Sequence, residues 1–93
     1  MFDRVLKRMR ELVRTRQYVM TLHAEDEMDA DGLTIYDVES AIFTGQITER
    51  QRDRASAEWK YAVSGQSLSG DAVTVVARFG PTGKSVFITV FRE

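Results

Sequence analysis

Apolar residues recur every three or four positions near the start of the chain and predict an amphipathic helix over residues 2–16. The repeating positions are Phe2, Val5, Leu6, Met9, Leu12 and Val13. Thr21 is a suitable N-cap for a second, short helix that ends at Gly32. The outer face of the first helix is basic, whereas the second helix is acidic.

A third helix is predicted from the capping-box pair Thr34 and Asp37 to Gly45. After Gly45 the apolar period changes from helical to alternating, which is typical of strands. The predicted strands cover residues 46–52, 57–64, 72–79 and 85–91. The run Gly80-Pro-Thr-Gly83 forms the hairpin turn between the last two.

Helices that precede strands predict an α+β fold in one domain over residues 1–93. Two to three N-terminal helices pack on one face of a C-terminal four-stranded antiparallel meander, because short connections favour antiparallel neighbours. The alternating charges of the run Glu49–Arg54 predict a solvated edge strand or loop rather than a nucleic-acid patch. Aromatic residues on the strands either form the core or stack nucleic-acid bases, and the core is the stronger interpretation.

The composition is that of a globular domain, with 43% hydrophobic and 29% charged residues. The absence of cysteine excludes disulfides, thiolate chemistry and cysteine-ligated zinc. No apolar run approaches the roughly 20 residues of a membrane span, so we expect a cytoplasmic protein without a membrane partner. The net charge of −1 conceals a basic first segment followed by an acidic one.

His23 is the only histidine and the natural candidate for acid–base chemistry near neutral pH. Glu27 lies four residues later and therefore projects from the same helical face. The pair is expected to form a hydrogen bond or ion pair; a zinc site would need a third ligand, which the sequence does not supply. We expect no metal and no cofactor. A structural role for His23, in capping or packing, stays open beside the functional one.

Three segments resemble a bacterial family of unknown function, DUF4258. The first is Tyr18, Thr21, His23, Ala24 and Met28; the second is Asp37, Val38, Ala41, Ile42, Gly45, Ile47 and Glu49; the third is Ile88-Thr-Val-Phe91. The chain departs from the family pattern where Glu27 and Asp31 replace arginines and Phe91 replaces a tyrosine. These departures remove cations and a hydroxyl from the region expected to meet a substrate.

The family's layout is similar to the small ribonuclease fold of barnase, colicin nuclease domains and toxins that cleave messenger RNA. The resemblance implies metal-independent RNA cleavage, with His23 as base or acid. Lys60, Arg78 and Arg92 would hold the phosphate, and Thr89 or Tyr61 would donate hydrogen bonds. The predicted catalytic residues are His23, Lys60, Arg78 and Thr89, and the predicted substrate-binding residues are Tyr61 and Arg92. Strand alternation, however, predicts that Thr89 and Arg92 face opposite sides.

The alternative is a non-catalytic protein-interaction domain on the same scaffold, which the low net charge favours. The partner classes that follow are RNA, a cognate antitoxin or another protein, and a second copy of the chain.

Overall fold

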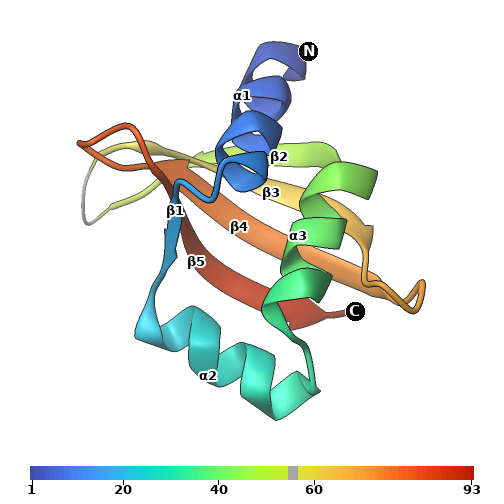
Figure 1. The fold of residues 1–93 in the computed structure, drawn as a ribbon. Coiled ribbons are helices and arrows are strands. Elements are labelled where there is room, and N and C mark those ends of the chain that lie inside the picture. Colours follow the sequence, from blue (N-terminus) through green and yellow to red (C-terminus); the bar gives the residue numbers. More distant parts are fainter. Residues whose placement is uncertain (55–56) are drawn as a thin grey trace.

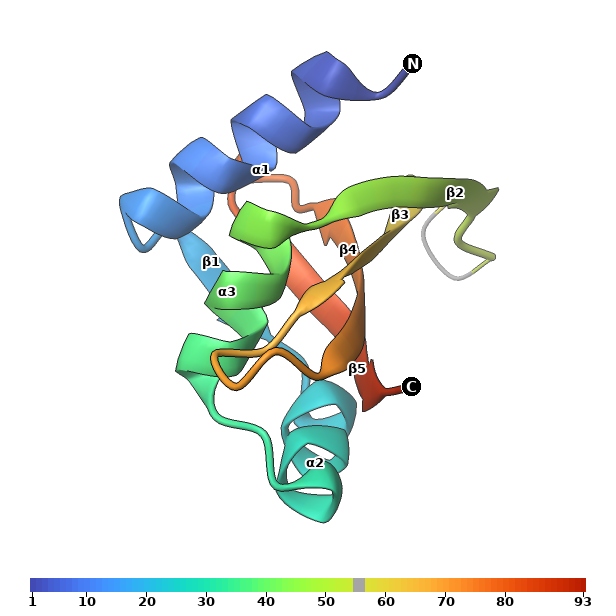
Figure 2. The same ribbon diagram turned by 90° about the vertical axis from the view of Figure 1, so that its right-hand side faces the viewer.

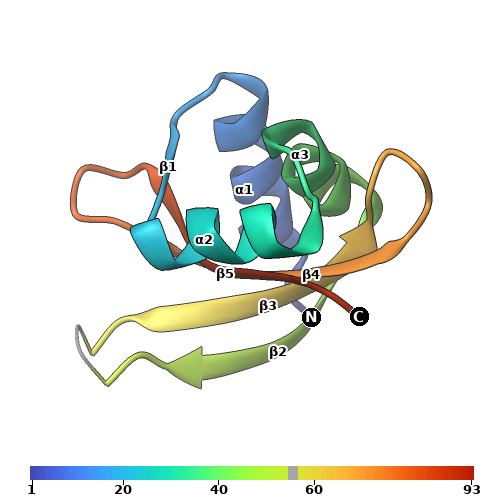
Figure 3. The ribbon, with the colours of Figure 1, turned by 90° about the horizontal axis from the view of Figure 1, so that it is seen from below.

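A computed structural model describes residues 1–54 and 57–93, in which three helices cover one face of a five-stranded sheet (Figures 1 and 3). The elements in chain order are α1 (Asp3–Arg14), β1 (Tyr18–Met20), α2 (Leu22–Asp31), α3 (Ile35–Thr44), β2 (Gln46–Arg52), β3 (Trp59–Gln66), β4 (Ala72–Phe79) and β5 (Ser85–Arg92). The α+β class and the packing of the helices on one face are confirmed.

The prediction of a four-stranded meander is wrong, because the sheet has the order β1-β5-β4-β3-β2 over the residues described. The short strand β1 pairs in parallel with β5, with Tyr18 opposite Ser85 and Met20 opposite Phe87. Strands β2 to β5 form the predicted antiparallel succession. The sheet is therefore a meander extended by one parallel strand that comes from between the first two helices.

The predicted ends of α2 are confirmed by its capping contacts. The Thr21 hydroxyl accepts a hydrogen bond from the Ala24 amide at 3.1 Å. Gly32 ends the helix with a left-handed backbone, φ 67°, which glycine adopts without steric cost. Local sequence signals are thus enough to position α2 and the histidine in its first turn.

The capping box of α3 is also confirmed, and its carboxylate accepts a further hydrogen bond from outside the helix. Asp37 accepts hydrogen bonds from the Thr34 amide at 2.9 Å and from the Leu68 amide at 3.0 Å. These bonds, led by the one from the Thr34 amide, lower the pKa of Asp37 below its ordinary value. Asp37 consequently joins the start of α3 to the turn between β3 and β4.

The core lies between the helices and the sheet face that they cover. Its fully buried side chains include Met9 and Val13 of α1 and Phe87 of β5. Helix α3 approaches β3 so closely that a Cβ atom on Gly65 would lie 2.1 Å from the Ala41 carbonyl oxygen. Only glycine fits at this crossing. The opposite face of the sheet carries no helix (Figure 3), and it is on this face that part of the expected chemistry lies.

Candidate functional site

A small hollow of about 90 Å³ lies on the uncovered face of the sheet. It is lined by Glu49, Gln51, Lys60, Ala62, Val76 and Thr89. The strand register explains this gathering, because Glu49, Ala62, Val76 and Thr89 stand opposite one another in a row across four strands. The structure thus brings together two predicted catalytic residues, Lys60 and Thr89.

Two β-bulges turn the polar ends of this row toward the hollow. One extra residue, Thr48, lies between Ile47 and Glu49, and another, Ile88, lies between Phe87 and Thr89. Simple alternation would place Glu49 on the same side as Ile47, which packs on the core. A bulge reverses this alternation and re-aims the side chain that follows it. Both bulges therefore have the same effect on the site.

The hollow combines a carboxylate, a side-chain amide, an ammonium group and a hydroxyl. The Gln51 amide donates a hydrogen bond to the Glu49 carboxylate, and Gln51 stands opposite Lys60. Among residues 1–54 and 57–93, no carboxylate lies within ion-pair distance of Lys60. Glu49 was not predicted as a site residue; the run Glu49–Arg54 was predicted as a solvated edge strand or loop, and Glu49 lies in the edge strand β2. That placement is confirmed, but the side chain also faces Lys60 and Thr89 across the hollow.

Arg78 flanks the hollow without lining it. It lies two residues after Val76 on β4 and so projects from the same face. Its Nε atom lies 3.9 Å from the Asp53 carboxylate, and its side chain is 24% exposed. Arg78 therefore supplies a second cation beside Lys60, partly neutralised by Asp53.

His23 lies in the first turn of α2, and this helix packs beside β5 (Figure 2). Its side chain is 67% exposed, and its Nε2 atom lies 3.2 Å from the Glu27 carboxylate. The same carboxylate oxygen accepts a hydrogen bond from the Val90 amide at 3.1 Å. The predicted His23–Glu27 interaction is confirmed. His23 does not line the hollow, but it is linked through Glu27 to the residue after Thr89.

Helix α2 closes the edge of β5 beyond the point where β1 ends. Glu27 accepts from the Val90 amide, Asp31 accepts from the Arg92 amide at 2.9 Å, and the Thr21 hydroxyl donates to the Ile88 carbonyl at 3.0 Å. These side chains replace the hydrogen bonds that a longer β1 would make. The two acidic departures from the family pattern therefore have a structural role at this edge.

The two predicted substrate-binding residues lie on the other side of the sheet. Tyr61 is buried among aromatic rings, with its centroid 6.0 Å from that of Phe2 and 6.3 Å from that of Phe79. The Arg92 guanidinium donates to Asp71 and to the Asp31 carbonyl. The predicted separation of Thr89 and Arg92 agrees with the register of β5. Neither Tyr61 nor Arg92 reaches the hollow.

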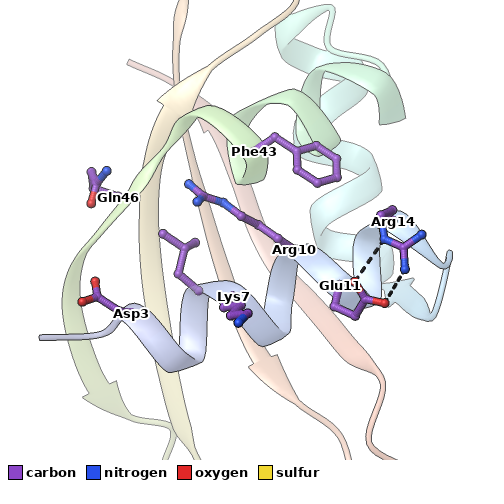
Figure 4. A pocket seen from close by; sticks show the side chains of 8 residues that line it. Asp3, Lys7, Arg10, Glu11, Arg14, Phe43 and Gln46 are labelled. Carbon is purple, nitrogen blue, oxygen red and sulfur yellow. Dashed lines mark hydrogen bonds and ion pairs between the residues drawn. The ribbon is translucent and has the colours of Figure 1, made fainter.

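A larger hollow, about 490 Å³, lies between α1 and α3 (Figure 4). Arg10 reaches across it and donates to the carbonyls of Ile42 and Gly45 at 3.0 and 2.8 Å. Arg14 pairs with Glu11 on the same helix. These two cations are therefore already engaged, and Arg10 ties α1 to the end of α3.

Within the part of the chain that the structure describes, no three histidine, cysteine, aspartate or glutamate side chains gather as a metal site would require. Of the described helices, none has both the length and the apolar character of a membrane span.

Comparison with known proteins gives a family and no individual relative. No curated protein and no solved structure matches the chain. The family model described as "Domain of unknown function (DUF4258)" matches residues 20–92, which run from the end of β1 to the end of β5. The match includes His23, Glu27 and every residue that lines the small hollow on the uncovered face. The chain therefore belongs to the DUF4258 family.

Proposed function

We propose that this domain binds RNA on the uncovered face of its sheet and cleaves it without a metal ion. The observation that carries the proposal is the hollow itself, where Glu49, Lys60 and Thr89 meet on a surface that no helix covers. Arg78 adds a second cation beside it. A carboxylate, cations and a hydroxyl are the groups that phosphodiester cleavage by proton transfer requires.

The proposed reaction uses the RNA 2′-hydroxyl as nucleophile. Its oxygen forms a bond to the adjacent phosphorus while the bond from phosphorus to the 5′-oxygen breaks. A base on the protein accepts the 2′-hydroxyl proton, and an acid donates a proton to the departing 5′-oxygen. The products are a 2′,3′-cyclic phosphate and a free 5′-hydroxyl, so atoms and charge balance without an external reagent.

Glu49 is the proposed base, because its carboxylate is exposed at the rim of the hollow and is held by Gln51. Lys60 neutralises the charge that develops on the phosphate oxygens, and the Thr89 hydroxyl donates to one of them. Lys60 and His23 are the two proposed proton donors. His23 reaches a substrate only if the RNA extends past the edge of β5, where Glu27 orients the imidazole.

The test is incubation of the full chain with single-stranded RNA in the presence of a chelator. We expect products with 2′,3′-cyclic phosphate ends and no cleavage where the scissile nucleotide lacks its 2′-hydroxyl. Glu49→Gln and Lys60→Met should each lower kcat/KM by about 10²–10⁴, the usual contribution of a general acid or base. Asp26→Asn is the matched control, because Asp26 is an exposed carboxylate on α2.

The variant His23→Ala distinguishes the two proton donors. If His23 is the donor, this variant loses activity as severely as Lys60→Met. If Lys60 is the donor, His23→Ala retains activity. A wild-type protein that leaves RNA intact from pH 5 to 9, or a Glu49→Gln variant with unchanged activity, would refute the proposal.

The alternative of a non-catalytic interaction domain is favoured by one observation on the helical side. Tyr36 and Phe43 of α3 and Leu68 of the following turn are 56%, 45% and 71% exposed, and they line a common hollow. Neighbouring exposed apolar side chains often mark a protein-binding surface. A protein that neither binds nor cleaves RNA, and that self-associates unless Phe43 and Leu68 are replaced by serine, would support this alternative.

A further inference from the structure

Three arginines lie over aromatic rings on the helical side of the sheet, near β2 and the N-terminal part of α1. The guanidinium carbons of Arg50 and Arg52 lie 3.9 and 4.2 Å from the centroid of the Trp59 ring. Arg50 also lies 5.9 Å from the Phe2 ring, and Arg8 lies 4.2 Å from the Phe79 ring. We call Arg8, Arg50, Arg52, Phe2, Trp59 and Phe79 the arginine–aromatic cluster.

The three guanidinium groups of this cluster belong to exposed residues. Of the residues described, no carboxylate lies within ion-pair distance of Arg8, Arg50 or Arg52. Arg52 donates one hydrogen bond, to the Ala57 carbonyl at 2.7 Å. Elsewhere in the chain Arg14, Arg78 and Arg92 each face a carboxylate. The cluster is therefore a concentration of uncompensated positive charge.

The geometry of the cluster suits a single-stranded nucleic acid. A guanidinium that stacks on a ring keeps the N–H groups around its edge free for the oxygens of a phosphate. The half-buried Trp59 ring offers a surface on which a base can stack once an arginine turns toward the backbone. A nucleic acid matches both features, because its phosphates pair with the guanidinium groups and each of its bases can stack on the ring.

Strand β2 connects this cluster to the hollow on the opposite face. It is the last strand in the described sheet, at the outer edge in Figure 3. Arg50 and Arg52 stand opposite Tyr61 and Trp59 on the helical side, whereas Glu49 and Gln51 point to the hollow. A single strand of nucleic acid that leaves the hollow can therefore cross β2 and reach the cluster, because Glu49 and Arg50 are adjacent residues on opposite faces of this strand.

We propose that the arginine–aromatic cluster is a second binding site for single-stranded RNA, which holds the segment next to the one in the hollow. The choice of RNA rests on the proposed function, whereas the site itself rests on the cluster. Arg50 and Arg52 contact phosphates, Trp59 stacks on a base, and β2 is the ridge that the RNA crosses.

Trp59 is the only tryptophan of the chain, so its fluorescence reports on this site directly. The experiment titrates the full chain with a single-stranded oligonucleotide whose 2′-hydroxyls are methylated, which cannot undergo the proposed cleavage. We expect the emission of Trp59 to change in parallel with binding measured by anisotropy of a dye on the oligonucleotide. Unchanged emission at saturation, or no binding at all, would overturn the proposal.

The test variant carries Arg50→Gln and Arg52→Gln. The control variant carries Lys7→Gln and Arg14→Gln, which remove the same charge from the larger hollow between α1 and α3. Loss of two phosphate contacts should reduce the slope of log K against log salt by about 1.4, because each contact on a single strand contributes about 0.7. The dissociation constant should rise at least tenfold relative to the control variant. Equal slopes and constants in the two variants would overturn the proposal.

Two further measurements separate the possible failures. Circular dichroism and the melting temperature establish that each variant is folded, and Arg50→Lys with Arg52→Lys restores the charge without the planar stacking and should recover part of the affinity. If the wild-type protein binds through Trp59 but cleaves no RNA, the proposed function fails and the second site stands. If it cleaves RNA while the arginine variant binds as the control does, the second site fails alone.

Discussion

The carboxylate of Glu27 joins α2 to β5, and its removal tests how the edge of the sheet is closed. One of its oxygens accepts from the Val90 amide at 3.1 Å and lies 3.2 Å from His23 Nε2. In Glu27→Ala the Val90 amide loses its acceptor beyond the end of β1. We expect a less stable protein whose β5 edge opens more easily, with the rest of the fold retained.

The size of the effect follows from burial. An unsatisfied buried backbone donor costs about 1–3 kcal/mol, but Glu27 is 25% exposed, so water partly replaces the lost bond. The His23 pair adds at most about 0.5 kcal/mol, because His23 is 67% exposed. Alanine is a slightly better helix former than glutamate and offsets a few tenths of this. The net loss of unfolding free energy should be about 1–2 kcal/mol.

Urea unfolding monitored by circular dichroism measures this loss, and amide hydrogen exchange locates it. Asp26→Ala is the matched control, because Asp26 is the exposed neighbour of Glu27, and its removal should change stability by less than about 0.5 kcal/mol. Glu27→Gln keeps an acceptor oxygen for Val90 and should lose less than half as much as Glu27→Ala. The amide of Val90 should exchange faster in Glu27→Ala, while the Val75 amide in β4 is affected only through global unfolding.

Two results would refute this account of the edge. One is a Glu27→Ala protein as stable as Asp26→Ala. The other is unchanged protection of the Val90 amide, which would mean that a different group satisfies it.

Four other changes test contacts elsewhere in the fold. Asp37→Ala should lower the free energy of unfolding in urea by about 1–2 kcal/mol, because it removes the acceptor for the Thr34 and Leu68 amides. Since folding lowers the pKa of Asp37, this contribution is present at neutral pH and is lost as the pH falls below about 3.8, which acid unfolding of Asp37→Ala beside the wild type measures. Burial and the hydrogen bond to Glu39 raise the pKa of Tyr18 from 10.0 to about 12, so the wild type should lose stability between these pH values and Tyr18→Phe should lose less over the same range. Ser85→Ala should leave the free energy of unfolding unchanged or raise it by up to about 1 kcal/mol, because the buried Ser85 hydroxyl has no hydrogen-bond partner among the residues described; the melting temperature checks this. Gly65→Ala should cost about 3 kcal/mol or abolish folding in a thermal melt, because its Cβ would collide with the Ala41 carbonyl, and a change below 1 kcal/mol would contradict the close crossing.

The helices could be predicted because their ends depend on neighbours in sequence. The hydroxyls of Thr21 and Thr34 cap amides three residues ahead, and Gly32 takes the left-handed backbone that ends α2. The strands β2 and β4 match their predicted ranges, whereas β3 begins two residues later than predicted. Such signals operate within a few residues and need no knowledge of the fold.

Strand β1 could not be predicted for the opposite reason. Three residues are too few to show an alternating pattern, and Tyr18–Met20 becomes a strand only by pairing with Ser85–Phe87 at the other end of the chain. Glu49 was missed for a related reason, since the bulge at Thr48 reverses the face that alternation predicts. Where the extra residue of a bulge falls depends on the pairing with the neighbouring strand, which is β3 for Thr48. Lys60 and Thr89 were predicted as site residues, but their meeting in one hollow follows from pairings between distant strands.

The two edges of the sheet solve the same physical problem in different ways, and the difference bears on function. An exposed edge offers unpaired amides and carbonyls to other chains unless it is covered or charged. At β5 the carboxylates of Glu27 and Asp31 take the free amides, so an arginine there, which has no acceptor atom, could not make these bonds. At β2 the edge is instead protected by exposed charged residues and a bulge. Those charges, Glu49 toward the hollow and Arg50 and Arg52 toward Trp59, stay accessible to a ligand, so the free edge is where binding is to be sought.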